Sequence, residues 1–114
     1  MTQDIYSCVS GQKTIPAIGS YNDPVFTGTP VLTSTSLTMP SVTFDSGTAL
    51  QSYTVAIIDS YSNYWYAFSG AISSIASPLN ITEAYLETGN TYTVYIIVYD
   101  QRGRSSIKSW NLSL

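Results

Sequence analysis

The sequence predicts an all-β fold, a single antiparallel β-sandwich of about seven strands. Its β-branched and aromatic residues fall in short runs, and its five prolines and seven glycines lie mostly between those runs. No segment has the length and periodicity of a long helix. The chain has 114 residues, of which 44% are hydrophobic, a size and composition that suit one domain with one core.

The first part of the chain predicts an arm followed by two strands. Residues 1–28 are expected to form an irregular N-terminal arm, and residues 29–114 the sandwich, because Pro24 and Pro30 mark turns or sheet edges. Strands are expected near residues 31–35 and over residues 37–44. Apolar alternation slips across Pro40 in the second of these, which predicts a bulge or an edge position there.

The remaining strands follow at short intervals. After a turn at residues 45–48, alternating or aromatic runs predict strands over residues 53–58, 61–68, 79–81, 92–100 and 107–114. Gln-Arg-Gly-Arg at residues 101–104 has the composition of a hairpin loop between the last two strands.

The strongest fold signal is the segment of residues 86–99, LETGNTYTVYIIVY. Leu86, then Gly89 in a turn, precede Tyr92, which opens the longest alternating strand. A β-sandwich passes from one sheet to the other through a corner of this kind.

On these residues the chain resembles a fibronectin type III domain over about residues 28–114. The family has a Leu, a Pro-Gly turn and a Tyr before its sixth strand; Leu86, Gly89 and Tyr92 match them, with Thr88 where Pro is usual. The resemblance implies a binding or spacer module without catalysis, on a fold that carries many functions.

Two further motifs match the family and one departs from it. The family's Tyr-x-Val of the third strand resembles residues 53–55, and its Gly-x-Ser before the last strand resembles residues 103–105. No Trp stands in the second strand, where Phe44 or Met39 would take its place. This departure leaves a related immunoglobulin-like topology open.

Charge and hydropathy exclude several classes of function. Charged residues make up 10% of the chain and the net charge is −3, with only four Lys and Arg residues, too few for the basic stripe of a nucleic-acid-binding protein. No run of 18 apolar residues predicts a membrane span, and residues 1–8 lack the pattern of a secretory signal. Surfaces rich in uncharged polar residues suit packed assemblies, and we expect an extracellular or virion-surface location.

The sequence contains no signature of catalysis, and we expect neither enzyme activity nor a cofactor. Histidine is absent, and Cys8 is the only cysteine, so neither a zinc site nor an internal disulfide is expected. Cys8 is expected to act as a small apolar residue, with an intermolecular disulfide as the alternative. Asp59 and Asp100 follow neighbouring strands and are expected at the same end of the sandwich, where loop capping is commoner than glycosidase chemistry.

Alternation in the long strands predicts an apolar patch on the outside of one sheet. If Tyr92 and its alternate neighbours point into the core, the residues between them point outward, and Ile58 joins them from the adjacent strand. An antiparallel sandwich usually presents a polar outer face. There are three alternatives: residues 1–28 fold over this patch, a protein partner or second copy covers it, or its aromatic residues are exposed and have no role. The expected interface residues are Ile58, Tyr95, Ile97 and Tyr99.

A second aromatic cluster offers an alternative site, a stacking platform for sugar rings. In the more ordinary interpretation Tyr64, Tyr66 and Phe68 pack on one face while Trp65 caps the edge of the sandwich. The platform residues would be Tyr64, Trp65 and Tyr66, with Asp59, Asn63 and Gln51 as partners for sugar hydroxyls.

Together these features predict a non-enzymatic structural or interaction protein. The specific hypothesis is an accessory subunit, of the decoration or cement type, of a virion or other surface assembly, docked through the Tyr-rich patch and residues 1–28. A carbohydrate-binding or adhesion module and a spacer domain of an extracellular protein are the alternatives.

Overall fold

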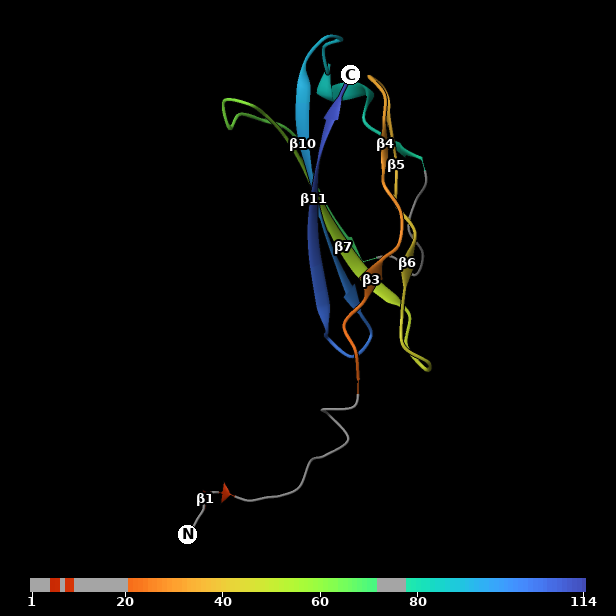
Figure 1. The fold of residues 1–114 in the computed structure, drawn as a ribbon, viewed down its shortest axis with the longest axis vertical. Coiled ribbons are helices and arrows are strands. Elements are labelled where there is room, and N and C mark those ends of the chain that lie inside the picture. The colour runs from red at the N-terminus through yellow and green to blue at the C-terminus, as the bar shows by residue number, and fades with distance from the viewer. Residues whose placement is uncertain (1–4, 7, 10–20, 72–77) are drawn as a thin grey trace.

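The computed structural model describes residues 5–6, 8–9, 21–71 and 78–114 (Figure 1). Within these residues the chain is all-β, as predicted, with no α-helix and one short 3-10 turn, η2 (Thr82–Ala84). Near the N-terminus, β1 (Ile5–Tyr6) and β2 (Cys8–Val9) form a short parallel pair. The rest of the predicted arm up to residue 20 lies outside the described residues.

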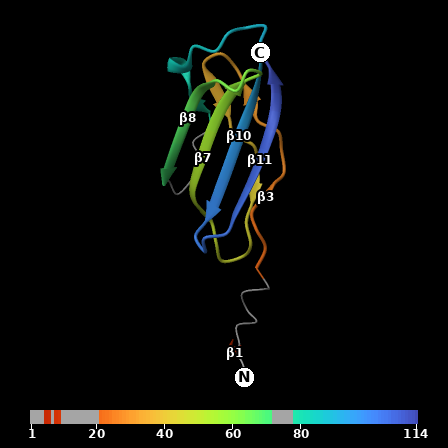
Figure 2. The same cartoon turned by 90° about the vertical axis from the view of Figure 1, so that its left-hand side faces the viewer.

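One layer of the fold is a sheet of four long strands (Figure 2). These are β7 (Leu50–Asp59), β8 (Tyr64–Ala71), β10 (Thr91–Asp100) and β11 (Ser105–Ser113). They lie in the order β11-β10-β7-β8, and every neighbouring pair is antiparallel. The long alternating strand predicted after Tyr92 therefore lies inside the sheet, with β7 on one side and β11 on the other.

The second layer consists of short strands and faces one side of this sheet (Figure 1). In it β3 (Val25–Phe26) pairs with β6 (Val42–Thr43). β4 (Val31–Leu32), β5 (Ser36–Thr38) and β9 (Leu79–Asn80) form a three-stranded sheet in the order β4-β5-β9. Because β3 belongs to this layer, the layer begins before residue 29, where the sandwich was expected to start.

The slip in alternation at Pro40 separates two strands. The segment expected as one strand over residues 37–44 is divided into β5 and β6, with residues 39–41 between them. Met39 and Pro40 are both buried there, so two successive side chains turn toward the interior. A continuous strand would have sent one of them to solvent.

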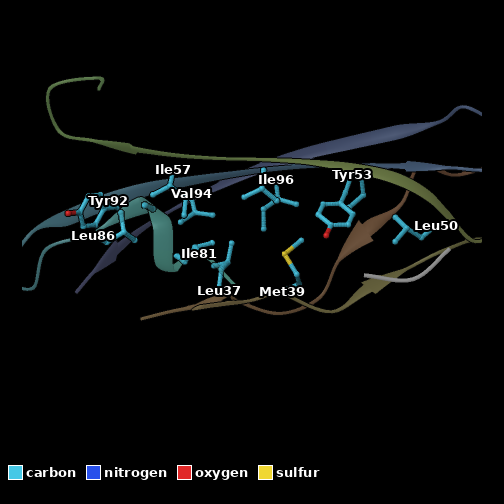
Figure 3. Close-up of a cluster of buried hydrophobic side chains, with 13 residues drawn as sticks. Leu37, Met39, Leu50, Tyr53, Ile57, Ile81, Leu86, Tyr92, Val94 and Ile96 are labelled. Carbon is cyan, nitrogen blue, oxygen red and sulfur yellow. The ribbon is translucent and has the colours of Figure 1, made fainter. Parts of the chain in front are cut away.

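The core lies between the two layers (Figure 3). Alternate residues of β10, from Tyr92 to Val98, have no solvent exposure, and those of β7 from Tyr53 to Ile57 have at most 1%. The second layer contributes Leu37, Met39 and Ile81. Each large apolar side chain buried in this way contributes about 1.5–3 kcal/mol, so the inward positions of the long strands dominate folding.

The corner before β10 is tied together by one hydroxyl group. The Tyr92 hydroxyl accepts a hydrogen bond from the Glu87 backbone N–H at 2.8 Å. Between these residues Gly89 has φ of +95°, a conformation that costs glycine little, and its N–H donates to the Leu114 carbonyl at 2.9 Å. The Leu86-Gly89-Tyr92 segment thus joins the start of β10 to the end of the chain.

At the opposite end, the β10–β11 loop holds the segment that leads into β3. The Arg102 guanidinium lies over the Tyr21 ring, 3.9 Å from its centroid. Arg104 Nε lies 3.1 Å from Asp23 Oδ1 in an ion pair. These two contacts fix where the chain joins the two-layered domain.

Candidate interaction face

The four-stranded sheet has one face turned away from the second layer, and we call it the outer face (Figure 2). Its side chains come from alternate residues between Ser52 and Ile58 on β7, Thr91 and Tyr99 on β10, and Ser105 and Ser113 on β11. β8 adds Tyr64, Ala67 and Ser69 through its pairing with β7. None of these positions carries a charged residue.

The outer face contains an apolar hollow with a volume of about 440 Å³. Ala56 and Ala67 pair across β7 and β8, and their small side chains leave room in the surface. Tyr64 borders the hollow and is 74% exposed, and Ile107 borders it from β11 and is 62% exposed. The residues that line it are Thr54, Val55, Ala56, Ile58, Tyr64, Ala67, Tyr95, Ile97 and Ile107.

An irregularity in the β7–β8 pairing shapes one side of this hollow. Ile57 pairs with Tyr66 but Ile58 pairs with Tyr64, so Trp65 is an extra residue on β8. An extra residue of this kind bends a strand and increases its twist. The β7–β8 hairpin accordingly turns away from the second layer, to the left in Figure 1. Tyr64 lies on this bent part of the hairpin, beside the hollow.

Asp59 organises the hairpin turn through four donors. Oδ1 accepts the backbone N–H of Tyr61 at 2.8 Å and of Asn63 at 3.0 Å. Oδ2 accepts the Trp65 indole N–H at 2.9 Å and the Asn63 side-chain amide at 3.2 Å. The Trp65 bond, followed by the Asn63 backbone bond, lowers the pKa of Asp59 to about 2. Both oxygen atoms of this carboxylate therefore already accept hydrogen bonds from the turn and from Trp65.

Three of the four expected interface residues line the hollow together. Ile58, Tyr95 and Ile97 border it from β7 and β10, with Tyr95 38% exposed. Tyr99 lies on the same face and is 36% exposed, but it stands nearer the end of β10 and does not line the hollow. The predicted outward direction of these side chains agrees with the burial of the residues between them.

The three residues of the expected sugar platform are separated. Tyr64 is on the outer face, whereas Trp65 meets the buried Tyr92 edge to face, with ring centroids 5.8 Å apart. Tyr66 packs against the core, and burial raises the pKa of its hydroxyl. Because the rings point in different directions, they do not form a single stacking surface.

The polar residues expected beside the sugar platform either hydrogen-bond to each other or lie at the far end of β7. Asn63 donates to Asp59, as described, and both belong to the hairpin turn. Gln51 lies at the start of β7, the opposite end of that strand from Asp59. Among the described residues, these polar side chains and the three aromatic rings therefore do not come together in one sugar-binding site.

The expectation that Asp59 and Asp100 share one end of the fold is wrong. β7 and β10 are antiparallel, so Asp59 pairs with Tyr92 at one end and Asp100 with Leu50 at the other. Asp100 is 2% exposed. Its Oδ1 accepts the backbone N–H groups of Arg102 and Arg104 at 2.8 and 2.9 Å, which caps the β10–β11 loop.

Sequence reasoning did not assign five of the lining residues to a site, and these are Thr54, Val55, Ala56, Ala67 and Ile107. Ile107 pairs directly with Ile97, and Ala67 with Ala56. The signal for Ile107 is its place in the last alternating strand, but its neighbours depend on the register of the β10–β11 hairpin. Tyr64 was assigned to the sugar platform, and the structure groups it with the interface residues instead.

The part of the chain that the structure describes contains neither a candidate metal site nor a candidate membrane span. No cluster of three or more His, Cys, Asp and Glu residues there could hold a metal ion. No helix in the same residues is long and apolar enough to cross a membrane. The side chain of Cys8 lies outside the described residues.

In comparisons with known proteins, no family model, curated protein or solved structure matches the chain.

Proposed function

We propose that this protein is a non-enzymatic interaction module that docks into a larger protein assembly through its outer face. The observation that carries the proposal is the hollowed, charge-free outer face of the four-stranded sheet. Antiparallel sheets with one face on a core usually present polar side chains to water on the other. Here Ile58, Tyr95, Ile97 and Ile107 occupy outward positions, and their burial by a partner would be favourable.

We further propose an immunoglobulin-like sandwich of the fibronectin type III kind. The order β11-β10-β7-β8 opposite β4-β5-β9 supports this, because β10, the strand that follows the corner, is one of the two inner strands of the four-stranded sheet. The hydrogen bond between Glu87 N–H and the Tyr92 hydroxyl supports it too, since such a tyrosine corner recurs in these domains. The fold carries many functions, so the outer face remains the basis of the functional proposal.

The composition of the outer face favours a protein partner over a sugar. Tyr provides contact area and a hydroxyl group at low entropic cost, and Ile and Ala provide apolar area without polar groups that need partners. Sugar recognition would need polar side chains directed at hydroxyls beside a flat aromatic surface, and Trp65 and Tyr66 are turned toward the core. An accessory subunit of a virion or another extracellular surface assembly is the setting that we propose.

The proposal is tested by co-sedimentation from the source cells, using the full chain and two lysine variants. Ile97→Lys places a charge in the hollow, whereas Val31→Lys changes a 57% exposed residue on β4 in the other layer. We expect the parent and Val31→Lys chains to sediment with a large assembly and Ile97→Lys to remain at the mass of the free chain. Circular dichroism of each purified variant controls for folding.

Two results would contradict the proposal. One is a parent chain that sediments only as the free protein. The other is a folded Ile97→Lys chain that enters the assembly as well as Val31→Lys does, because the outer face would then not be the docking surface.

A further inference from the structure

We infer that the occupant of the outer face is a second copy of this chain, packed face to face in a two-fold symmetric contact. This inference rests on the proposed role of the outer face and specifies its partner. In a two-fold contact the same patch is used by both subunits and must be complementary to itself. The charge distribution and the shape of the outer face are compatible with such a contact, and its area is large enough for one.

The charge distribution favours contact between identical faces. Among the described residues, the charged side chains lie in loops, in η2, at strand ends or, for Lys108, on the opposite side of β11, next to Trp110. Two outer faces would therefore meet without opposing like charges, which cost several kcal/mol when they are forced together. No charge would have to be desolvated either.

The shape of the face pairs a projection with a hollow. Tyr64, 74% exposed on the bent hairpin, stands beside the hollow floored by Ala56 and Ala67. A two-fold axis repeats this arrangement, so the tyrosine of each copy can enter the hollow of the other and the contact is made twice. Aromatic side chains seated in pockets are frequent centres of binding energy in protein interfaces.

The size of the face is that of a stable interface. Its four strands have eight to ten residues each. At the usual strand spacing and rise they span roughly 20 Å by 30 Å. With side-chain relief this approaches the ~800 Å² per partner that standard interfaces bury. Sheets also pack face to face readily, with their strands about 30° apart.

The first test measures the mass of the purified full chain by sedimentation equilibrium over a range of concentrations. We expect a reversible dimer of the 12.4 kDa chain. Tyr64→Ala should weaken it at least ~10-fold, as loss of an aromatic side chain seated in a pocket does. Tyr61→Ala is the matched control, because Tyr61 is 84% exposed three residues away and does not line the hollow. Equal dissociation constants for the two variants would overturn the inference.

The second test uses charge at position 97, near the middle of the face. Ile97→Lys and Ile97→Glu chains should each be monomeric, because each would bring like charges together across the two-fold axis. An equal mixture should recover dimers, since the two charges then attract. A mixture that stays monomeric, with both variants folded, would argue against the two-fold contact.

The two proposals fail in different ways. A parent chain that is monomeric at high concentration but enters the assembly through Ile97 excludes the second copy and leaves the interaction module standing. A chain that forms the two-fold dimer but never enters a larger assembly supports the inference that a second copy covers the outer face. The same result contradicts the proposed role in a larger assembly.

Discussion

The two faces of strand β10 both carry large apolar or aromatic side chains but differ in what surrounds them. Tyr92, Val94, Ile96 and Val98 have no solvent exposure. Between them Tyr95 and Tyr99 are 38% and 36% exposed, and Ile97 borders an open hollow. The inward residues are covered by the second layer, whereas no described residue covers the outward ones. Apolar content on the outer face therefore adds little to folding and is available for association.

The largest expected effect is on the inward face. Ile96→Ala should lower the free energy of unfolding by about 2–5 kcal/mol, because it opens a cavity in a fully buried position. Ile97→Ala, one residue along the same strand, should cost about 1 kcal/mol or less. Urea denaturation measured below the dissociation constant of any dimer compares them. Similar losses for the two variants would mean that the outward residue is also part of the folding core.

A smaller effect is expected for the hydroxyl groups of the two faces. Tyr92→Phe should cost about 1–2 kcal/mol, because the Glu87 N–H would lose its acceptor in a partly buried corner. Tyr95→Phe, on the exposed side of the same strand, should change stability by no more than a few tenths of a kcal/mol. Thermal unfolding of both variants would measure the difference, and a neutral Tyr92→Phe would show that the corner does not depend on this bond.

The smallest effect concerns the hairpin that carries Tyr64. The pKa of Asp59 is lowered to about 2 in the folded chain, from the ordinary value of 3.8 for an aspartate side chain. Its contribution to stability is therefore present above about pH 4 and is lost as the pH falls toward 2. Asp59→Asn should flatten the dependence of the unfolding midpoint on pH in this range.

Part of the acid dependence should remain in that variant. The hydrogen bonds from Asn22 also lower the pKa of Asp45, which lies elsewhere in the fold. An Asp59→Asn chain with the same slope as the parent between pH 2 and 4 would show that the Trp65 and Asn63 bonds do not hold the hairpin.

The inward and outward sides of the long strands could be predicted from the sequence, because side chains alternate with a period of two. The all-β class and the Leu86-Gly89-Tyr92 corner were predicted for similar local reasons. The grouping of Ile58 with Tyr95 and Ile97 across β7 and β10 was also predicted, whereas the Ile97–Ile107 pair was not, since it depends on the register of the β10–β11 hairpin. The extra residue at Trp65 could not be predicted either. Because of this extra residue, Tyr64 lies on the outer face, whereas Tyr66 lies on the face that packs against the core.

The contacts at the two ends of the domain have a mechanical consequence. Arg102 and Arg104 hold residues 21–23 at one end, and the Gly89–Leu114 and Leu114–Asn90 bonds hold the last residue at the other. Tension between these points would run along the strands, as their positions in Figure 1 indicate. Ladder hydrogen bonds lie across the strands, so they would be loaded in shear and would have to break together. A domain held in this way would resist extension more strongly than one pulled open from a single edge.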